Sequence, residues 1–181
     1  MNIRPAAEAD AEALAAIYGH HVLHGFGTFE EVPPPPAEIE QRRQAIVGRG
    51  LPYLVAEAEG RVLGFAYAAP FRLRAAYRYT AEDSVYIAPD AHRKGVGRAV
   101  LSAVLDECAA LGLRQIVAVI GDSGNAGSIG LHAALGFEPI GTAQGFGYKK
   151  GRWVDLVLMQ KSLNGGIGRE PDAPGLTLSG V

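Results

Sequence analysis

Two glycines separated by one residue, with basic residues on both sides, stand in the stretch HRKGVGR at residues 92–98. The stretch follows a strand-like run that ends at Pro89, and it precedes an apolar run typical of a helix. The first N–H groups of a helix have no partner within it and attract anions, and glycine lets a phosphate approach the backbone closely. Arg93, Lys94 and Arg98 add positive charge. The stretch therefore predicts a pyrophosphate site, although a flexible helix start with solvated basic side chains would have the same sequence.

Two common nucleotide motifs do not fit this stretch. A dinucleotide fingerprint requires a third glycine where Val100 stands, and a phosphate-loop NTPase requires Gly-Lys-Ser/Thr after the glycines. A different phosphate-containing ligand is therefore expected.

The composition restricts the class of protein. The formal net charge of -2 gives no general attraction to nucleic acid or to anionic membranes, so we expect neither as a partner. The single cysteine, Cys108, excludes an internal disulfide framework and is expected in the core. The first residues lack the pattern of a secretory signal, and no apolar run approaches the roughly 20 residues of a membrane helix. These features predict a cytoplasmic protein.

The hydrophobic pattern predicts a mixed α/β domain over residues 1–163. Gly and Pro are too frequent in residues 164–181 to predict packed structure, so we expect a tail there. Four Pro residues at 33–36 predict a stiff connection between two helices. Helices are expected over 8–25, 37–50, 95–112 and near 125–137, and strands over 2–6, 52–70 (two strands joined at Glu59-Gly60), 79–89, 114–120 and around 145–150 and 153–160.

The stretch HRKGVG before a long helix, followed about thirty residues later by NAGSIGLHAALGF, resembles the GCN5-related N-acetyltransferase (GNAT) superfamily. The resemblance implies the GNAT fold, a mixed central sheet of about six to seven strands flanked by helices and splayed around the acyl-CoA site. It also implies acetyl-CoA as cosubstrate. Metal is not expected, since HHVLH at residues 20–24 lacks the glutamate of a zinc peptidase motif.

The resemblance assigns a set of residues to acetyl-CoA. The glycine motif would hold the pyrophosphate, with His92 at a position where the superfamily has Gln or Arg. Asn125 and Ser128 would face the pantetheine arm, although on their own they are better explained as a helix cap. The full implied set is Val85, Tyr86, Ile87, His92, Arg93, Lys94, Gly95, Val96, Gly97, Arg98, Asn125 and Ser128.

The segments FGTFEE, FRLRAAYRYTAEDSVYI, GLHAALGF and GFGYKKGRWVDLVLMQ are together similar to the phosphinothricin acetyltransferase family. This resemblance implies acetylation of the α-amine of phosphinothricin, methionine sulfoximine or methionine sulfone, commonly by a homodimer. Phe29 and Glu30 would line the acceptor mouth. Arg72 and Arg74, expected to project from one extended segment, would bind the acceptor's anionic groups, although they also fit a solvated basic loop.

Acetyl transfer to an ammonium requires a base, and the resemblance implies Glu82 in this role. Asp83 should lie on the opposite face of a regular strand and is the reserve candidate. His132 matches a catalytic histidine of the family, although a histidine on an apolar helix is also typical of core packing. A backbone N–H near Tyr86 or Ile87, at a bulge, would bind the developing oxyanion.

Two other functions stay open on the sequence alone. The chain could be a GNAT enzyme for a protein amino terminus or a polyamine, although Arg72 and Arg74 disfavour cationic acceptors. It could also be an acyl-CoA-binding module without catalysis, which Glu82 and His132 disfavour.

Overall fold

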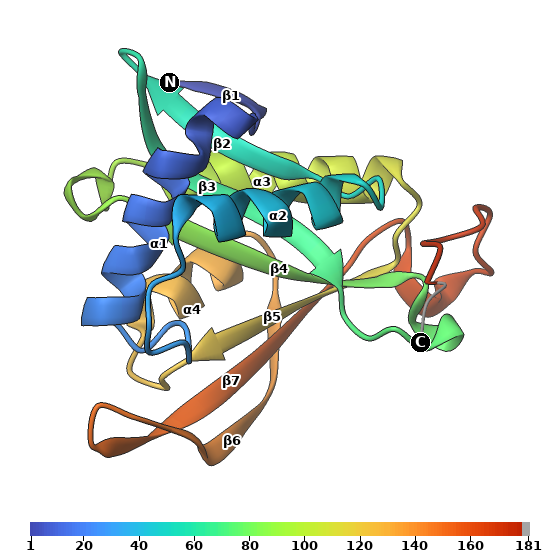
Figure 1. Cartoon of the computed structure of the whole chain (residues 1–181). Helices are drawn as coiled ribbons and strands as arrows, with labels where there is room; N and C mark the ends of the chain where they lie inside the picture. The colour runs from blue at the N-terminus through green and yellow to red at the C-terminus, as the bar shows by residue number, and fades with distance from the viewer. Residues whose placement is uncertain (179–181) are drawn as a thin grey trace.

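A seven-stranded sheet forms the centre of the computed structural model, which describes residues 1–178. The strand order is β1-β2-β3-β4-β5-β7-β6 (Figure 1). This architecture confirms the expected α/β fold class. The strands are β1 (Asn2–Pro5), β2 (Tyr53–Ala58), β3 (Arg61–Pro70), β4 (Thr80–Ile87), β5 (Gln115–Gly121), β6 (Glu138–Lys149) and β7 (Arg152–Ser162), and the helices are α1 (Ala11–His24), α2 (Pro36–Val47), α3 (Val96–Ala110) and α4 (Ala126–Ala134).

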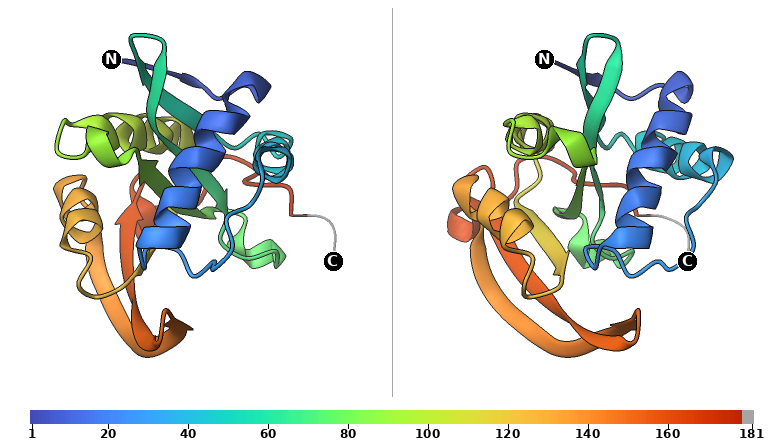
Figure 2. Two further views of the ribbon diagram at one scale, coloured as in Figure 1. Left: turned by 60° about the vertical axis from the view of Figure 1, so that its left-hand side comes forward. Right: turned by 90° about the vertical axis from the view of Figure 1, so that its left-hand side faces the viewer.

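Helices cover both faces of the sheet. Figure 2 shows α1 and α2 on one face and α3 and α4 on the other, with the long β6–β7 ribbon curving away below them. The core between these layers is aliphatic and aromatic, and Cys108 is fully buried in it, as expected. Among residues 1–178 no helix is long and apolar enough to cross a membrane.

Strands β4 and β5 are parallel neighbours for only half of their length. Their pairing runs from Thr80 opposite Gln115 to Asp83 opposite Ala118. Both strands continue beyond this point, and they diverge toward the end of α1 (Figure 1). The divergence leaves one edge of β4 without a neighbouring strand.

The free edge of β4 presents backbone groups of alternate residues. Hydrogen bonds from the N–H of Phe71 to the Thr80 carbonyl and from the N–H of Ala88 to the Leu63 carbonyl show that even-numbered β4 residues bond to β3. The N–H groups of Val85 and Ile87 therefore face the gap, whereas that of Tyr86 faces β3. The β3–β4 register is unbroken from Ala81 to Ile87, so the expected bulge is wrong.

Residues 164–178 pack along the domain despite their Gly and Pro content. The buried Arg114 guanidinium donates to the backbone carbonyls of Asn164, Arg169 (2.7 Å) and Glu170 (3.1 Å). The Tyr79 hydroxyl donates to the Ala173 carbonyl over 2.7 Å, and the Leu176 N–H donates to the Arg78 carbonyl over 2.7 Å. These contacts hold the segment beside the start of β4.

Candidate active site

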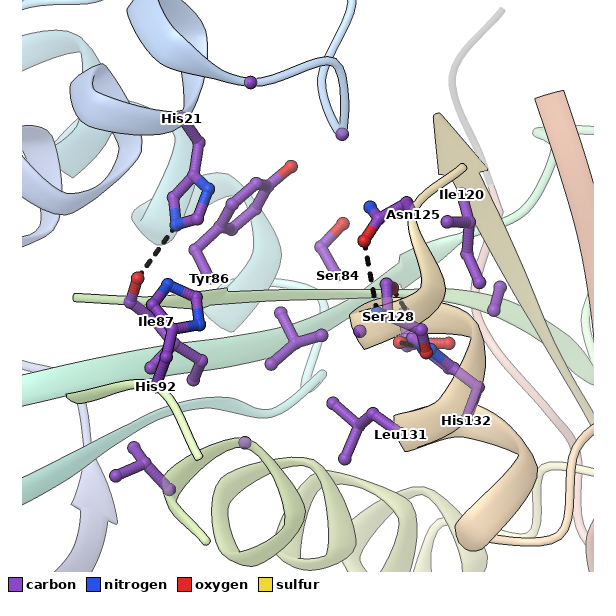
Figure 3. Close-up of a pocket in the computed structure, with 18 of the residues that line it drawn as sticks. His21, Ser84, Tyr86, Ile87, His92, Ile120, Asn125, Ser128, Leu131 and His132 are labelled. Carbon is purple, nitrogen blue, oxygen red and sulfur yellow. Dashed lines mark hydrogen bonds and ion pairs between the residues drawn. The ribbon is translucent and has the colours of Figure 1, made fainter. Parts of the chain in front are cut away.

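A cavity of about 680 Å³ lies between the diverging ends of β4 and β5. Its walls come from the end of α1, the start of α3 and the first turns of α4 (Figure 3). Of the residues predicted to bind acetyl-CoA, all except Lys94 line it; His132 lines it as well. The fold thus brings together segments that are more than a hundred residues apart in the sequence.

The start of α3 is open to this cavity. Gly95 precedes the helix with φ +79°, a conformation that favours glycine, and the first helical bond runs from the Ala99 N–H to the Gly95 carbonyl. The N–H groups of Val96, Gly97 and Arg98 therefore have no partner within the helix. Gly97 lets the helix pack closely on α4, because a Cβ there would lie 3.1 Å from the Leu131 side chain. The unpaired N–H groups at the helix start can hold a phosphate close to the backbone.

Two further walls offer polar groups along the length of the cavity. The free N–H groups of Val85 and Ile87 line one side, where they can donate hydrogen bonds to the amide carbonyl oxygens of an extended ligand. On the opposite side Asn125 caps α4, since its Oδ1 accepts from the Ser128 N–H over 3.2 Å. Both Asn125 and Ser128 also line the cavity, so capping does not exclude contact with a ligand.

The cavity fits acetyl-CoA by the chemistry of its walls. The helix start with Arg93 and Arg98 suits a pyrophosphate, and the gap beside β4 with its backbone donors suits a pantetheine arm. The acetyltransferase (GNAT) family model matches residues 18–137, which include every wall of the cavity described above. The chain belongs to the GNAT acetyltransferase family. It is an acyl-CoA-dependent N-acetyltransferase, and its cosubstrate is acetyl-CoA.

Similar GNAT proteins are known by sequence and by structure. A phosphinothricin N-acetyltransferase of Alcaligenes faecalis is 51% identical over 164 residues, which cover 91% of this chain and 83% of that protein. An L-methionine sulfoximine/L-methionine sulfone acetyltransferase of Pseudomonas paraeruginosa is 41% identical, with coverage of 90% and 95%. The crystal structure of a GNAT superfamily phosphinothricin acetyltransferase from Sinorhizobium meliloti with AcCoA has a TM-score of 0.91 and 47% identity, and the match covers 94% of this chain and 92% of that one.

The two candidate catalytic residues lie on opposite faces of β4 in this GNAT fold. Tyr86 shares a face with Glu82 and packs on Tyr18 of α1, with ring centroids 4.8 Å apart, so Glu82 faces the α1 side. Asp83 faces α4, where its Oδ2 lies 2.9 Å from Nε2 of His132. Glu82 is half-buried and lies outside the cavity lining.

The predicted acceptor residues lie away from the cavity lining. Arg72 and Arg74 are exposed in the β3–β4 loop, and the loop bends and contains a 3₁₀ turn, so the expectation of one extended segment is wrong. Phe29 packs near Gly147 of β6, and Glu30 accepts hydrogen bonds from Tyr18 and from Arg42 (2.9 and 2.6 Å).

Some cavity residues were not predicted from the sequence. His20, His21 and His24 at the end of α1 line the cavity, and His21 lies close to His92, with ring centroids 6.2 Å apart. The three clustered histidines of HHVLH are conspicuous in the sequence, but only the fold shows that they lie beside β4. Within residues 1–178, no group of three or more His, Cys, Asp or Glu side chains is arranged to hold a metal ion.

Proposed function

We propose that the enzyme acetylates the α-amine of an amino-acid-like acceptor of the phosphinothricin, methionine sulfoximine or methionine sulfone type. The observation that carries this proposal is the similarity over about nine tenths of the chain to acetyltransferases named for these acceptors. The position of Glu82 on the α1 side of β4, within reach of the Arg72 charge, supports it.

Glu82 is the proposed base in this reaction. Burial raises the pKa of its carboxyl, the nearby Arg72 charge lowers it, and the Asp83 charge raises it, with a net increase above the usual value. A raised pKa makes a carboxylate a better proton acceptor for an ammonium, directly or through one water molecule. The acceptor nitrogen would approach from this face, while acetyl-CoA would lie along the free edge of β4.

We propose that Arg72 and Arg74 attract the carboxylate and the tetrahedral oxyanionic group of the acceptor. Both guanidinium groups are on the loop that leads into β4, and Arg72 is close enough to act on the charge of Glu82. Glu30 is bound by Arg42 and Tyr18, so its role would be to fix the shape of the loop that carries Phe29.

The cavity residues would hold the cosubstrate and orient its thioester. The pyrophosphate would bind to the N–H groups of Val96, Gly97 and Arg98, with Arg93, Arg98 and His92 nearby. When bound, acetyl-CoA supplies the activated acetyl group. The N–H groups of Val85 and Ile87 are the donors along β4 for the pantetheine arm and for the carbonyl oxygen that becomes negative during transfer.

An acceptor panel tests the proposed function. Release of free thiol from acetyl-CoA would be measured with phosphinothricin, methionine sulfone, a polyamine and a peptide amino terminus. Turnover of the first two at least tenfold above the others is expected. Preference for the polyamine or the peptide would overturn the acceptor class, and coenzyme binding without turnover of any of the four would place the acceptor outside all of these classes.

We further propose that the enzyme is a cytoplasmic homodimer. The β6–β7 hairpin exposes Phe146, Tyr148 and Trp153, and the rings of the latter two lie 5.3 Å apart across the strands. A second copy could cover these aromatic side chains. Light scattering of the purified protein should give twice the chain mass of 19.0 kDa, and a monomeric mass at micromolar concentration would contradict the dimer.

A further inference from the structure

The imidazole of His132 is held at both nitrogen atoms. Nδ1 lies 2.7 Å from the Ser128 carbonyl oxygen, which can only accept, so Nδ1 carries a proton. Nε2 lies 2.9 Å from Oδ2 of Asp83. The side chains of His132 and Asp83 are 3% and 1% exposed. This geometry suits an imidazolium that donates to a carbonyl on one side and to a carboxylate on the other.

The charged surroundings favour the protonated ring. Burial lowers the pKa of His132, but the hydrogen bond and charge of Asp83, together with the bond to Ser128, outweigh burial and raise it above its usual value. The other side chains that face this pair are uncharged or on the far face of β4. Phe137 packs its ring at 5.0 Å, burial raises the pKa of the Cys108 thiol to about 12, and Glu82 faces α1.

Ser128 connects this buried pair with the cavity. Its hydroxyl oxygen lies 3.4 Å from Nδ1 of His132, so the Nδ1 proton has a second acceptor on the same residue. Ser128 is half-buried and lines the cavity, as Figure 3 shows. His132 and Ser128 both line this cavity, and the hydroxyl lies beside Nδ1 at the wall of the space in which acetyl-CoA fits.

We propose that Asp83, His132 and Ser128 form a proton relay that protonates the departing coenzyme thiolate. As the acetyl carbon–sulfur bond breaks, its electron pair goes to sulfur. The Ser128 hydroxyl proton forms the new S–H bond, and the Nδ1 proton of His132 passes to the Ser128 oxygen. His132 becomes neutral and keeps the proton on Nε2, which donates a hydrogen bond to Asp83. Nδ1 is reprotonated from solvent before the next turnover.

In this relay Ser128 touches the reacting sulfur, whereas Asp83 is a positioning residue that acts through His132. The relay also separates the two proton movements, since Glu82 takes the amine proton on one face of β4 and His132 supplies a proton on the other. The inference rests on acetyl transfer from the coenzyme and not on the acceptor proposed above.

The charge of His132 is measurable without turnover. NMR titration of the histidine ring signals in the free enzyme, assigned with a His132→Gln variant, should give His132 a pKa above its ordinary value of about 6.5. Asp83→Asn should lower that pKa below the wild-type value. A His132 ring that is neutral at pH 6 in the wild-type enzyme would overturn the relay, even if no variant at Asp83 folds.

Kinetic variants test the hydroxyl. Ser128→Ala should lower kcat about a hundredfold, the usual scale for a lost acid, with a KM for acetyl-CoA within about threefold of wild type. Ser128→Thr keeps the hydroxyl and should restore most of the rate. Ser102→Ala, which removes a hydroxyl from α3 outside the cavity, is the control. Equal kcat in Ser128→Ala and wild type, or equal losses in the Ala and Thr variants, would overturn the assignment.

The dependence of kcat on pH and on the choice of acceptor separates this inference from the proposed function. The alkaline decrease of kcat should move to lower pH in Asp83→Asn, because less of His132 is then protonated. The loss in Ser128→Ala should be the same for every acceptor that the wild type acetylates. A loss confined to one acceptor, or an unmoved alkaline limb, would contradict the relay while leaving the acceptor class intact.

Discussion

The Nε2 atom of His21 donates a hydrogen bond to the Ile87 carbonyl oxygen over 2.9 Å and so joins the last turn of α1 to the free edge of β4. The odd-numbered carbonyls of β4 point away from β3, and at Ile87 no neighbouring strand is left to satisfy them. Burial lowers the pKa of His21, while the bond to Ile87 opposes this effect. The ring is therefore neutral at neutral pH.

His21→Leu should lower the free energy of unfolding by about 1 kcal/mol at pH 7, because the Ile87 carbonyl loses its donor. Because the pKa of His21 is lower in the folded protein, the unfolded chain binds a proton at this residue more readily than the folded chain does. The contribution of His21 is therefore present above about pH 6.5 and is lost as pH falls toward the folded pKa. Urea unfolding between pH 5 and 8 measures this, with His24→Leu, at an exposed position of α1, as the control. Identical pH dependence in wild type and His21→Leu would contradict the argument.

Glu82→Gln should lower kcat by about a hundredfold at neutral pH, because it keeps the shape of the side chain and removes the proton acceptor. The deficit should shrink as pH rises toward the pKa of the acceptor amine, since more free amine is then supplied by solution. Since the pKa of Glu82 is raised, the wild-type acid limb of kcat/KM should lie above the ordinary glutamate range. Full activity of Glu82→Gln would remove Glu82 from the reaction, and a loss that is constant with pH would indicate that its charge only positions the ammonium.

Gly97→Asp should raise the Kd for acetyl-CoA by roughly tenfold or more, because it puts negative charge where the α3 N–H groups would hold the pyrophosphate. An aspartate in the first turn of a helix also interacts favourably with the helix dipole. Gly97→Ala is the matched control, since its Cβ meets the same Leu131 side chain at 3.1 Å without adding charge. Isothermal titration of both variants gives the comparison, and equal Kd values in the two would exclude phosphate binding at this helix start.

Arg74→Ala should weaken acceptor binding by about 1.5–3 kcal/mol, the range for a charge-assisted hydrogen bond, with little change in coenzyme affinity.

Arg72→Gln should in addition move the acid limb of kcat/KM to higher pH, because the Arg72 charge lowers the pKa of Glu82. Acceptor saturation curves across pH 5–9 test both statements. Wild-type KM values in both variants would identify these arginines as surface residues without a role in recognition.

The elements with strong local signals were predictable from the sequence. Gly25 ends α1, and Glu59 and Gly60, both at positive φ, make the two-residue turn between β2 and β3. Strand β6 begins at Glu138, well before the predicted start near residue 145. Its early residues are mostly exposed and its pairing with β7 shifts twice, so the alternation of apolar and polar residues that marks a strand is missing there.

The candidate site was predictable only where one segment carries it. The glycine stretch before α3 contains its own signal, because helix start, glycine and basic residues are consecutive. The pairing of Asp83 with His132 and of His21 with Ile87 joins residues 49 and 66 positions apart, so spacing alone could not predict either contact. The alternation of side chains along a regular strand did predict that Asp83 and Glu82 face opposite sides of the sheet.

The segment after β7 affects the flexibility of the β3–β4 loop, which is proposed to bind the acceptor. Residues 173–176 bond to Tyr79 and Arg78, which close the β3–β4 loop that carries Arg72 and Arg74. The conformational entropy of that loop is therefore coupled to the order of a stretch that contains no proposed site residue. Substitutions at residues 173–176 would therefore change how tightly the proposed acceptor is held without altering Arg72 or Arg74 themselves.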